Sequence, residues 1–377
     1  RMTEAGAVFG PVNGWERAMW FAQAGDDVSE AATQTWDRAG PWEPRIRAEC
    51  AAVRDGCGMI ALPGFTRLRV TGPGARDHVN RLCASRLPPP GRIGLAYFPD
   101  DRGRIVTETS VIVTGAEDVE LITAAAAQWH DAELLTASAP GCVSVHDETE
   151  ARECLLVTGP NSRDVLARLV EGHDLTAPWL SVSPQGKVAG QPARMVRVSF
   201  AGELGWEIHM APEAAPVVWD ALSEAGVVPF GMHALDALRL EKGYGAWKTD
   251  LSSDYTLLEA GLQRFIDFDK PEGFPGRGAL LAEREAGSRR RVAGLVVAAG
   301  DSDAPAMAPV MQNGEIVGEV TSGAWGYRVG SSLALALLRA DLAQPETALE
   351  VEIYGERVPA RVHQMPFWDP RNARLRA

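Results

Sequence analysis

A near-repeat inside the chain constrains the fold more than any other feature of the sequence. Residues 70–82 read VTGPGARDHVNRL and residues 157–169 read VTGPNSRDVLARL, with the same amino acid at eight aligned positions. In both copies an apolar run, a Gly-Pro pair and an amphipathic run led by Arg-Asp predict a strand, a turn and a helix. The repetition therefore predicts two related α+β units that lie side by side.

The sequence changes in character after about residue 289. Short apolar segments alternate there with glycine and polar turns, and NGEIVGEVTSG and YGERVPARV are typical of β-hairpins. We therefore expect an antiparallel barrel or sandwich at the C-terminus. A chain of 377 residues is long enough for two or three domains. The expected parts are an N-terminal arm at 1–45, α+β lobes at 46–150 and 151–289, and a β-barrel at 290–377.

Composition argues against several classes of protein. The formal net charge of −13 argues against a nucleic-acid-binding surface. The five cysteines form no C-x-x-C pair and no cluster with histidine, so we expect no zinc site and no disulfide framework, but reduced thiols in a cytoplasmic protein. The sequence contains no run of 18 apolar residues, so we expect no membrane span. No glycine-rich loop of the dinucleotide-binding or P-loop type is present.

The stretch SFAGELGWEIHM, residues 199–210, is an unusual strand because two glycines and two glutamates interrupt it. We expect Gly202 and Gly205 to let a flat ring approach the backbone, and Trp206 to pack behind the strand. The carboxylate of Glu207 could accept two adjacent N–H groups as a bidentate pair. From the residue pattern alone, an exposed strand glutamate in an ion pair is the better explanation of Glu207.

Several motifs together resemble the tetrahydrofolate-dependent aminomethyltransferase family. They are VTGP before a helix, GRIVTETSV, SFAGELGWEI, LRLEKGYGAWKTDLSSDYTLLEAGL and VTSGAWGYRVGSSLALAL. This family contains the glycine cleavage T-protein and the folate-binding halves of dimethylglycine and sarcosine dehydrogenases, and the similarity covers roughly residues 7–377. The resemblance implies an α+β fold in which two related lobes with antiparallel sheets and a C-terminal β-barrel surround a central folate-binding opening.

The resemblance also implies roles for individual residues near the folate. Glu207 matches the glutamate that binds the pterin ring, and Phe200 matches a position, often tyrosine, where a ring stacks on or flanks the folate. Glu108 is expected to be the catalytic acidic residue, in place of the aspartate of the T-protein. A solvent-facing strand glutamate is the alternative for Glu108.

The remaining candidates have structural alternatives that the sequence leaves open. Arg239 is expected to bind the cofactor and the substrate carboxylate, or to pair with Asp236 three residues earlier. Glu259 is expected to bind the substrate amine, or to be a charge near a helix N-terminus. Trp325 and Tyr327 are expected to bring the barrel over the cofactor, or to belong to the barrel core.

The implied function is tetrahydrofolate-dependent one-carbon transfer, with tetrahydrofolate as the cofactor. The chain would accept a methyl-derived carbon, as an iminium or formaldehyde from an N-methyl amine such as dimethylglycine or sarcosine, and form 5,10-methylenetetrahydrofolate. One alternative is a direct demethylase of an N-, O- or S-methyl donor that forms 5-methyltetrahydrofolate. Another is a non-catalytic folate-binding protein of assembly or repair. The expected partners are a small-molecule methyl or aminomethyl donor and, for the first function, a flavoprotein subunit or domain.

Overall fold

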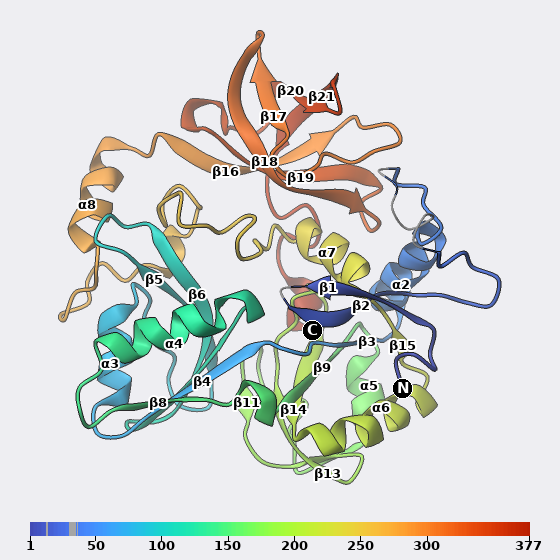
Figure 1. The fold of residues 1–377 in the computed structure, drawn as a ribbon, viewed down its shortest axis with the longest axis vertical. Coiled ribbons are helices and arrows are strands. Elements are labelled where there is room, and N and C mark those ends of the chain that lie inside the picture. The colour runs from blue at the N-terminus through green and yellow to red at the C-terminus, as the bar shows by residue number, and fades with distance from the viewer. Residues whose placement is uncertain (13, 30–34, 36) are drawn as a thin grey trace.

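The computed structural model describes residues 1–12, 14–29, 35 and 37–377, and its ribbon is drawn in Figure 1. Two sheets, antiparallel except for the parallel pairing of β15 (Val228–Pro229) with β3 (Gly58–Ala61), have helices packed against them and lie beside a C-terminal barrel. The expected architecture of two α+β lobes and a β-barrel is confirmed. In the described part of the chain, no helix is long and apolar enough to cross a membrane.

The first lobe is a sheet with strand order β5-β6-β7-β4-β8. Its elements are β4 (Thr66–Thr71), α3 (Ala75–Leu82), β5 (Ile93–Pro99), β6 (Ile105–Gly115), β7 (Asp118–Thr123), η1 (Ala125–Ala127), α4 (Gln128–Ala137) and β8 (Ser144–Asp147). Helices α3 and α4 bury their apolar residues against one face of this sheet. The other face is left for the second lobe.

The second lobe is a sheet with strand order β10-β12-β13-β14-β9-β3-β15, and β11 pairs with β13. Its elements are η2 (Thr149–Ala151), β9 (Glu153–Thr158), α5 (Ser162–Leu166), β10 (Val170–Glu171), β11 (Val182–Ser183), β12 (Lys187–Val188), β13 (Gln191–Val196), β14 (Gly205–Met210), η3 (Pro212–Ala214), α6 (Ala215–Glu224), β15 (Val228–Pro229) and α7 (Met232–Glu241). The order β9-β14-β13 corresponds to β4-β7-β6, as the near-repeat predicts.

The two lobes exchange one strand each. Strand β3 (Gly58–Ala61) directly precedes β4 in the chain but pairs with β9 of the second lobe. Strand β8 directly precedes β9 but pairs with β4 of the first lobe. The range 46–150 that we expect for the first lobe therefore includes α2 (Glu43–Asp55) and β3, which the structure places with the second sheet.

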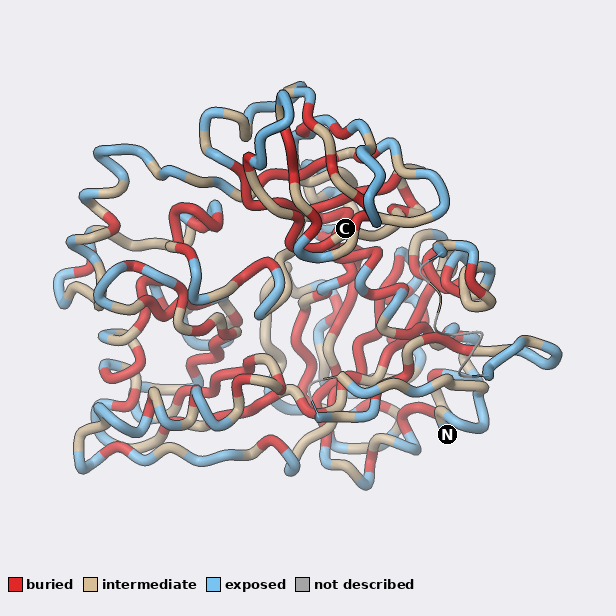
Figure 2. Tube along the Cα trace, turned by 45° about the horizontal axis from the view of Figure 1, so that its top comes forward, coloured by how far each residue is buried: buried red, intermediate tan, exposed pale blue. Residues whose placement is uncertain are grey.

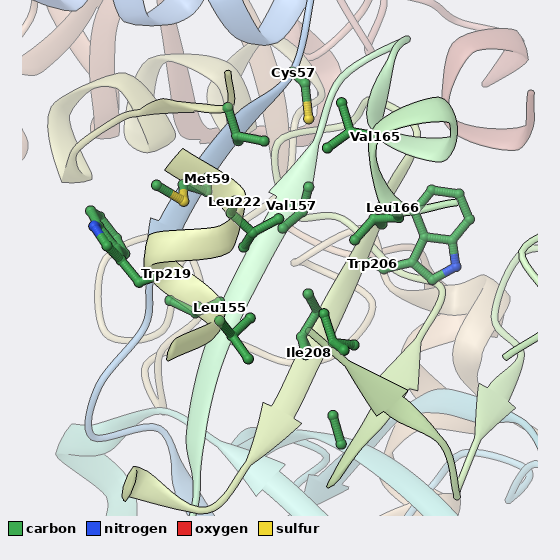
Figure 3. Close-up of a cluster of buried hydrophobic side chains, with 14 of the residues drawn as sticks. Cys57, Met59, Leu155, Val157, Val165, Leu166, Trp206, Ile208, Trp219 and Leu222 are labelled. Atoms are coloured by element: carbon green, nitrogen blue, oxygen red, sulfur yellow. The ribbon is translucent and has the colours of Figure 1, made fainter. Parts of the chain in front are cut away.

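Both faces of the second sheet are covered. On one face, α5 and α6 pack over an apolar cluster in which Trp206 lies behind β14, as predicted (Figure 3). On the other face, α2 and α7 pack over β3 and β9. The N-terminal hairpin of β1 (Ala7–Val12) and β2 (Trp15–Phe21) is anchored by Trp20, which is buried, and by Phe21, whose ring lies 6.4 Å from Trp219.

The C-terminal part is a closed barrel with order β16-β19-β18-β17-β20-β21. Its strands are β16 (Arg290–Val297), β17 (Pro309–Gln312), β18 (Glu315–Gly326), β19 (Ser331–Arg339), β20 (Ala348–Ile353) and β21 (Glu356–His363), with η5 (Ala340–Leu342). A long connection with η4 (Gln263–Phe265) and α8 (Arg277–Ala286) leads into it, and α9 (Ala373–Arg376) follows it. Figure 2 shows burial running through the strands of all three units, with exposed residues mainly in loops.

A buried arginine joins the barrel to the second lobe. Arg328, which follows β18, forms ion pairs with Glu241 at the end of α7 and with Glu203 just before β14, the latter at 2.7 Å. All three side chains are almost fully buried. Arg374 of α9 also pairs with Glu203, at 2.5 Å. The barrel and the C-terminal tail are therefore held to the second lobe through the buried carboxylates of Glu203 and Glu241, with Arg328 fully buried and Arg374 partly exposed.

Removing the buried cation should destabilise the protein strongly. Arg328→Met leaves Glu241 without its cationic partner, so we expect the free energy of unfolding to fall by about 3–5 kcal/mol. The control is Arg339→Met, because Arg339 pairs with Asp341 where both side chains are exposed, and this change should leave the free energy nearly unaltered. Urea denaturation followed by circular dichroism measures both. Equal losses in the two variants would contradict a special role for the buried pair.

Candidate functional site

Glu108 lies on the face of β6 that looks toward the second lobe. Alternate residues of β6 point to opposite sides of the sheet. Val111 belongs to the core under α3 and α4, and Thr107 donates a hydrogen bond to Asp131 of α4 at 2.9 Å. Glu108 and Ile112 therefore share the other face, where Ile112 packs with Val196 of β13.

The carboxyl group of Glu108 is paired with a tyrosine. Tyr97 lies directly opposite Glu108 in the pairing of β5 with β6, and its hydroxyl donates to Glu108 Oε1 at 3.3 Å. Burial raises the pKa of the Glu108 carboxyl to about 7, although the hydrogen bond from Tyr97 lowers it. Glu108 can therefore both give and accept a proton near neutral pH.

Glu207 faces the same region from the second lobe. Trp206 and Ile208 point into the core beneath α6, so Glu207 and His209 occupy the opposite face of β14. Glu207 pairs in register with Val196, the residue that packs against Ile112 on the face of Glu108. Two carboxylates from different lobes thus border one inter-lobe region, and the Glu207 side chain remains 20% exposed.

Aromatic rings and one cation complete this border. Phe200 is 37% exposed and stacks on Tyr244, with ring centroids 5.9 Å apart and planes at 22°. The ring of Phe265 lies 5.2 Å from Tyr97, and the Arg264 guanidinium lies 4.7 Å from the Phe265 ring. Burial raises the pKa of both tyrosines, and the charge of Arg264 opposes this effect on each. We define the inter-lobe site by Glu108, Glu207 and these five residues.

Four residues of this region were not predicted from the sequence: Tyr97, Tyr244, Arg264 and His209. Tyr97 could have been found, because a hairpin that pairs GLAYFP with the strand of Glu108 brings an aromatic hydroxyl opposite the carboxylate. Tyr244 lies in a loop whose path depends on the barrel, and no local pattern predicts its contact with Phe200.

Arg239 lies outside this site in a buried network. Its Nε and Nη2 donate to Asp236 at 2.7 and 2.6 Å, and its Nη1 donates to Asp250 at 2.6 Å. Nη1 also donates to the carbonyl oxygen of Tyr244, and Nη2 to Ser322 of β18. The ion pair with Asp236 that we held as the alternative is present. All guanidinium nitrogens are used within the protein, so this geometry does not support ligand binding by Arg239.

Glu259 is also engaged by the protein itself. Its carboxylate receives Arg290 of β16 at 3.0 and 3.1 Å. Glu259 and Thr256 exchange hydrogen bonds between side chain and backbone N–H, at 3.1 Å each, which is the arrangement of a capping box. The T-x-x-E spacing was visible in the sequence and explains Glu259 without a substrate amine.

Trp325 and Tyr327 contact the N-terminal part of the chain. The guanidinium of Arg38 lies 4.1 Å from the Trp325 ring, and that of Arg47 in α2 lies 5.7 Å from the Tyr327 ring. Tyr327 also packs against the cluster between α2 and α7. Neither residue has a described contact with Glu108, so their proximity to a cofactor stays a prediction that this geometry does not support.

The two glycines of residues 199–210 serve backbone packing rather than ligand approach, which corrects our expectation. Gly202 has φ +78°, and a Cβ there would collide with the side chain of Lys242. A Cβ at Gly205 would meet Thr158 Oγ1 and Val157 O, both at 2.9 Å. The space beside each glycine is therefore already filled by the protein.

The side chains of Cys154, Glu207 and His209 have ligand-type atoms within 4.8 Å of one another. Two guanidinium groups, Arg67 and Arg194, act electrostatically on His209 and disfavour its charged form. A metal cation would meet the same repulsion. The cluster is better explained by the hydrogen bond between His209 and Glu207.

The geometry suits a flat heteroaromatic ligand. Glu207 offers a carboxylate for adjacent N–H groups, Phe200 and Tyr244 offer aromatic faces, and Glu108 offers a group that exchanges protons.

A cavity of about 10 Å³ inside the first lobe is lined by Thr107 and Asp131 and has room for no more than a water molecule.

Comparisons with known proteins give a consistent result. Residues 1–270 match the family model described as the GCVT N-terminal domain, and residues 290–369 match the glycine cleavage T-protein C-terminal barrel domain. An aminomethyltransferase of Picosynechococcus sp. is 31% identical over 97% of this chain and 95% of its own length. The solved glycine cleavage system aminomethyltransferase T of Bartonella henselae has the same fold, with a TM-score of 0.83 at 22% identity over 98% of this chain and 96% of that one.

Two longer relatives also match. Mitochondrial dimethylglycine dehydrogenase of Rattus norvegicus is 30% identical over 96% of this chain and 43% of its own length. The 4-methylaminobutanoate oxidase (formaldehyde-forming) of Paenarthrobacter nicotinovorans is 33% identical over 100% of this chain and 46% of its own length. This chain therefore spans less than half the length of these two relatives.

The raised pKa of Glu108 predicts a pH-dependent stability. The folded carboxyl, with a pKa of about 7, holds its proton more tightly than the unfolded one at 4.5, so this stabilisation is complete below 4.5 and is lost as pH rises through 7. In Glu108→Gln this contribution is absent. The stability of Glu108→Gln relative to wild type should therefore increase between about pH 5 and about pH 8.

Urea denaturation at both pH values tests this prediction. The control is Glu213→Gln, which changes an exposed carboxylate in η3. A relative stability of Glu108→Gln that does not change with pH would contradict the raised pKa.

Proposed function

Because the chain belongs to the glycine cleavage T-protein family, we propose that it is a tetrahydrofolate-dependent one-carbon transferase whose reaction takes place at the inter-lobe site. The family and the T-protein fold support the assignment to the one-carbon transferases. One observation supports this location of the reaction. Glu108 and Glu207 come from different lobes, and they lie on the two sheet faces that meet at Ile112 and Val196.

Glu207 is proposed to bind the pterin ring of tetrahydrofolate. A pterin presents a ring N–H and an amino group side by side, which a carboxylate can accept as a pair. His209 engages Glu207 Oε2, and no described residue donates to Oε1. Phe200 and Tyr244, which stack on each other, are proposed to contact the flat ring. This residue-level role, like that of Glu108, is part of the proposal.

Glu108 is proposed to transfer protons and to stabilise the positive charge that develops during the reaction. Tetrahydrofolate supplies the nitrogen nucleophiles that capture the carbon. With a pKa of about 7, the Glu108 carboxyl can give a proton to the hydroxyl group that leaves when the captured carbon becomes an iminium. It can later take a proton from the folate nitrogen that attacks this carbon. In its ionised form it stabilises a neighbouring cation such as an iminium. Tyr97 holds the carboxyl by its hydrogen bond and keeps one oxygen oriented.

The proposed carbon source is an N-methyl amine that a separate flavoprotein subunit or domain has oxidised. The names of the two longer relatives, a dimethylglycine dehydrogenase and a formaldehyde-forming oxidase, support this choice. The product would then be 5,10-methylenetetrahydrofolate. The donor is proposed to be a small molecule such as dimethylglycine or sarcosine. The five cysteines are unpaired in the structure, and a cytoplasmic location remains part of the proposal.

The pterin contact predicts a loss of affinity when the carboxylate is neutralised. Glu207→Gln keeps the shape of the side chain but cannot accept two N–H groups as an anion, so tetrahydrofolate should bind about ten- to a hundredfold more weakly. Anaerobic isothermal titration calorimetry measures the affinity, and Glu213→Gln is the surface control. Unchanged affinity in Glu207→Gln would remove Glu207 from the site, and no binding by wild type would reject the proposed function.

The product distinguishes capture of an oxidised carbon from direct demethylation. We expect the protein to accelerate formation of methylenetetrahydrofolate from formaldehyde above the uncatalysed rate in buffer, and Glu108→Gln to lose most of this acceleration. Dimethylglycine or sarcosine alone should give no methyltetrahydrofolate. Chromatography of the folate products checks both statements. Methyltetrahydrofolate from a donor alone would reject capture, and binding without any acceleration would indicate a non-catalytic protein.

A further inference from the structure

His209 is a buried histidine that connects the two lobes at the inter-lobe site. It lies on the same face of β14 as Glu207, and its Nε2 lies 3.0 Å from Glu207 Oε2. Its Nδ1 lies 3.4 Å from Nη2 of Arg67, which belongs to β4 of the first lobe. The side chain of His209 has no exposure to solvent. A single imidazole ring thus lies between a cation of one lobe and a carboxylate of the other.

The neighbours of His209 determine which nitrogen carries its proton. A guanidinium has only N–H donors, so Nδ1 of His209 must accept from Arg67 and cannot itself be protonated. The proton of the neutral ring is therefore on Nε2, where it is donated to Glu207. Burial lowers the pKa of His209, and Arg194 and Arg67 lower it further although Glu207 acts in the opposite direction. The ring is consequently neutral at physiological pH.

Arg67 is itself held rigidly. It is 1% exposed, and its Nη1 donates to the carbonyl oxygen of Arg152 at 2.7 Å. Its backbone N–H donates to Thr149 Oγ1 at 3.1 Å. A second bridge beside it, between Arg194 of β13 and Glu120 of β7, joins the same two sheets with both side chains buried. The position of Arg67 relative to β14 is therefore determined by the docking of the two lobes.

We propose that His209 is a positioning residue for pterin binding, which Arg67 locks as the Nε2–H tautomer so that it orients the Glu207 carboxylate. This inference rests on the proposed function. The hydrogen bond fills one acceptor position of Glu207 Oε2 and leaves Oε1 and the remaining lone pair of Oε2 for the two N–H groups of the ligand. First-lobe residues would thus prepare a carboxylate of the second lobe before any ligand enters.

Substitutions that keep or remove the donor test this role. In His209→Gln, the amide can still donate to Glu207, and tetrahydrofolate affinity should stay within about twofold of wild type. In His209→Leu, the donor is absent, and affinity should fall about tenfold. His78→Leu is the matched control, because His78 of α3 is also buried but hydrogen-bonds to the carbonyl oxygen of Leu135 in α4. It should leave the affinity unchanged even if the protein is less stable.

A double-variant cycle separates positioning from general damage. If His209 acts through Glu207, the change His209→Leu should have almost no further effect on affinity in a Glu207→Gln background. The same tenfold loss in both backgrounds would overturn the proposal. Wild-type affinity in His209→Leu, together with weakened binding in Glu207→Gln, would also overturn it but would leave the proposed function intact.

The tautomer can be measured without any folate. Nitrogen-15 NMR of the wild-type protein labelled at histidine should show a proton on Nε2 only for the ring whose signals are lost in His209→Gln. In Arg67→Met this ring should take up a second proton at a higher pH than in wild type, because Arg67 no longer opposes its charged form. A protonated ring, or a proton on Nδ1 in wild type, would overturn the proposal even if the protein does not bind tetrahydrofolate.

Discussion

The buried guanidinium of Arg328 is the interaction on which the arrangement of the three units depends. It pairs with Glu241 and Glu203 and donates to the carbonyl oxygens of Ala201 and Leu238, all in the second lobe. A buried charge is tolerated only when its hydrogen bonds are satisfied. The barrel therefore has one favourable position relative to α7, and this position also fixes the segments at 199–204 and 242–250 that bring Phe200 and Tyr244 together.

The contact between the two lobes holds the two sheet faces of the inter-lobe site together. Because β3 and β8 are exchanged, the two sheets cannot separate without breaking β-ladders. The pair of Arg194 with Glu120 and the contact of Ile112 with Val196 then hold the uncovered faces together. Burial raises the pKa of Glu108 to about 7, and its hydrogen-bond partner Tyr97 packs against Phe265 of the connection to the barrel. A group that exchanges protons at neutral pH thus follows from tertiary packing around β6.

The candidate residues show how far the sequence could lead. The G-E-x-G-W-E motif contains two glutamates: Glu203 is buried in ion pairs, whereas the Glu207 side chain stays 20% exposed, and its pterin contact stays a prediction. For Arg239, the structural alternative, the ion pair with Asp236, is the arrangement found. Glu259 lies in a turn rather than at a helix N-terminus, and it pairs with Arg290. The capping box of Glu259 was readable locally, whereas the bond of Arg239 to Ser322 joins residues 83 positions apart. Partners at such separations cannot be inferred from one sequence.

By itself, the sequence determined the local elements, the repeated strand-turn-helix, the barrel hairpins and the alternation that puts Glu108 and Glu207 opposite core residues on their strands. These follow from backbone geometry, because successive side chains of a strand point to opposite faces. Only the tertiary structure decided that the two faces meet, that Tyr97 and His209 contact the carboxylates, and that burial changes the proton affinity of Glu108. Such properties depend on desolvation and charge from groups far apart in the chain, which exist only once the lobes and the barrel have packed.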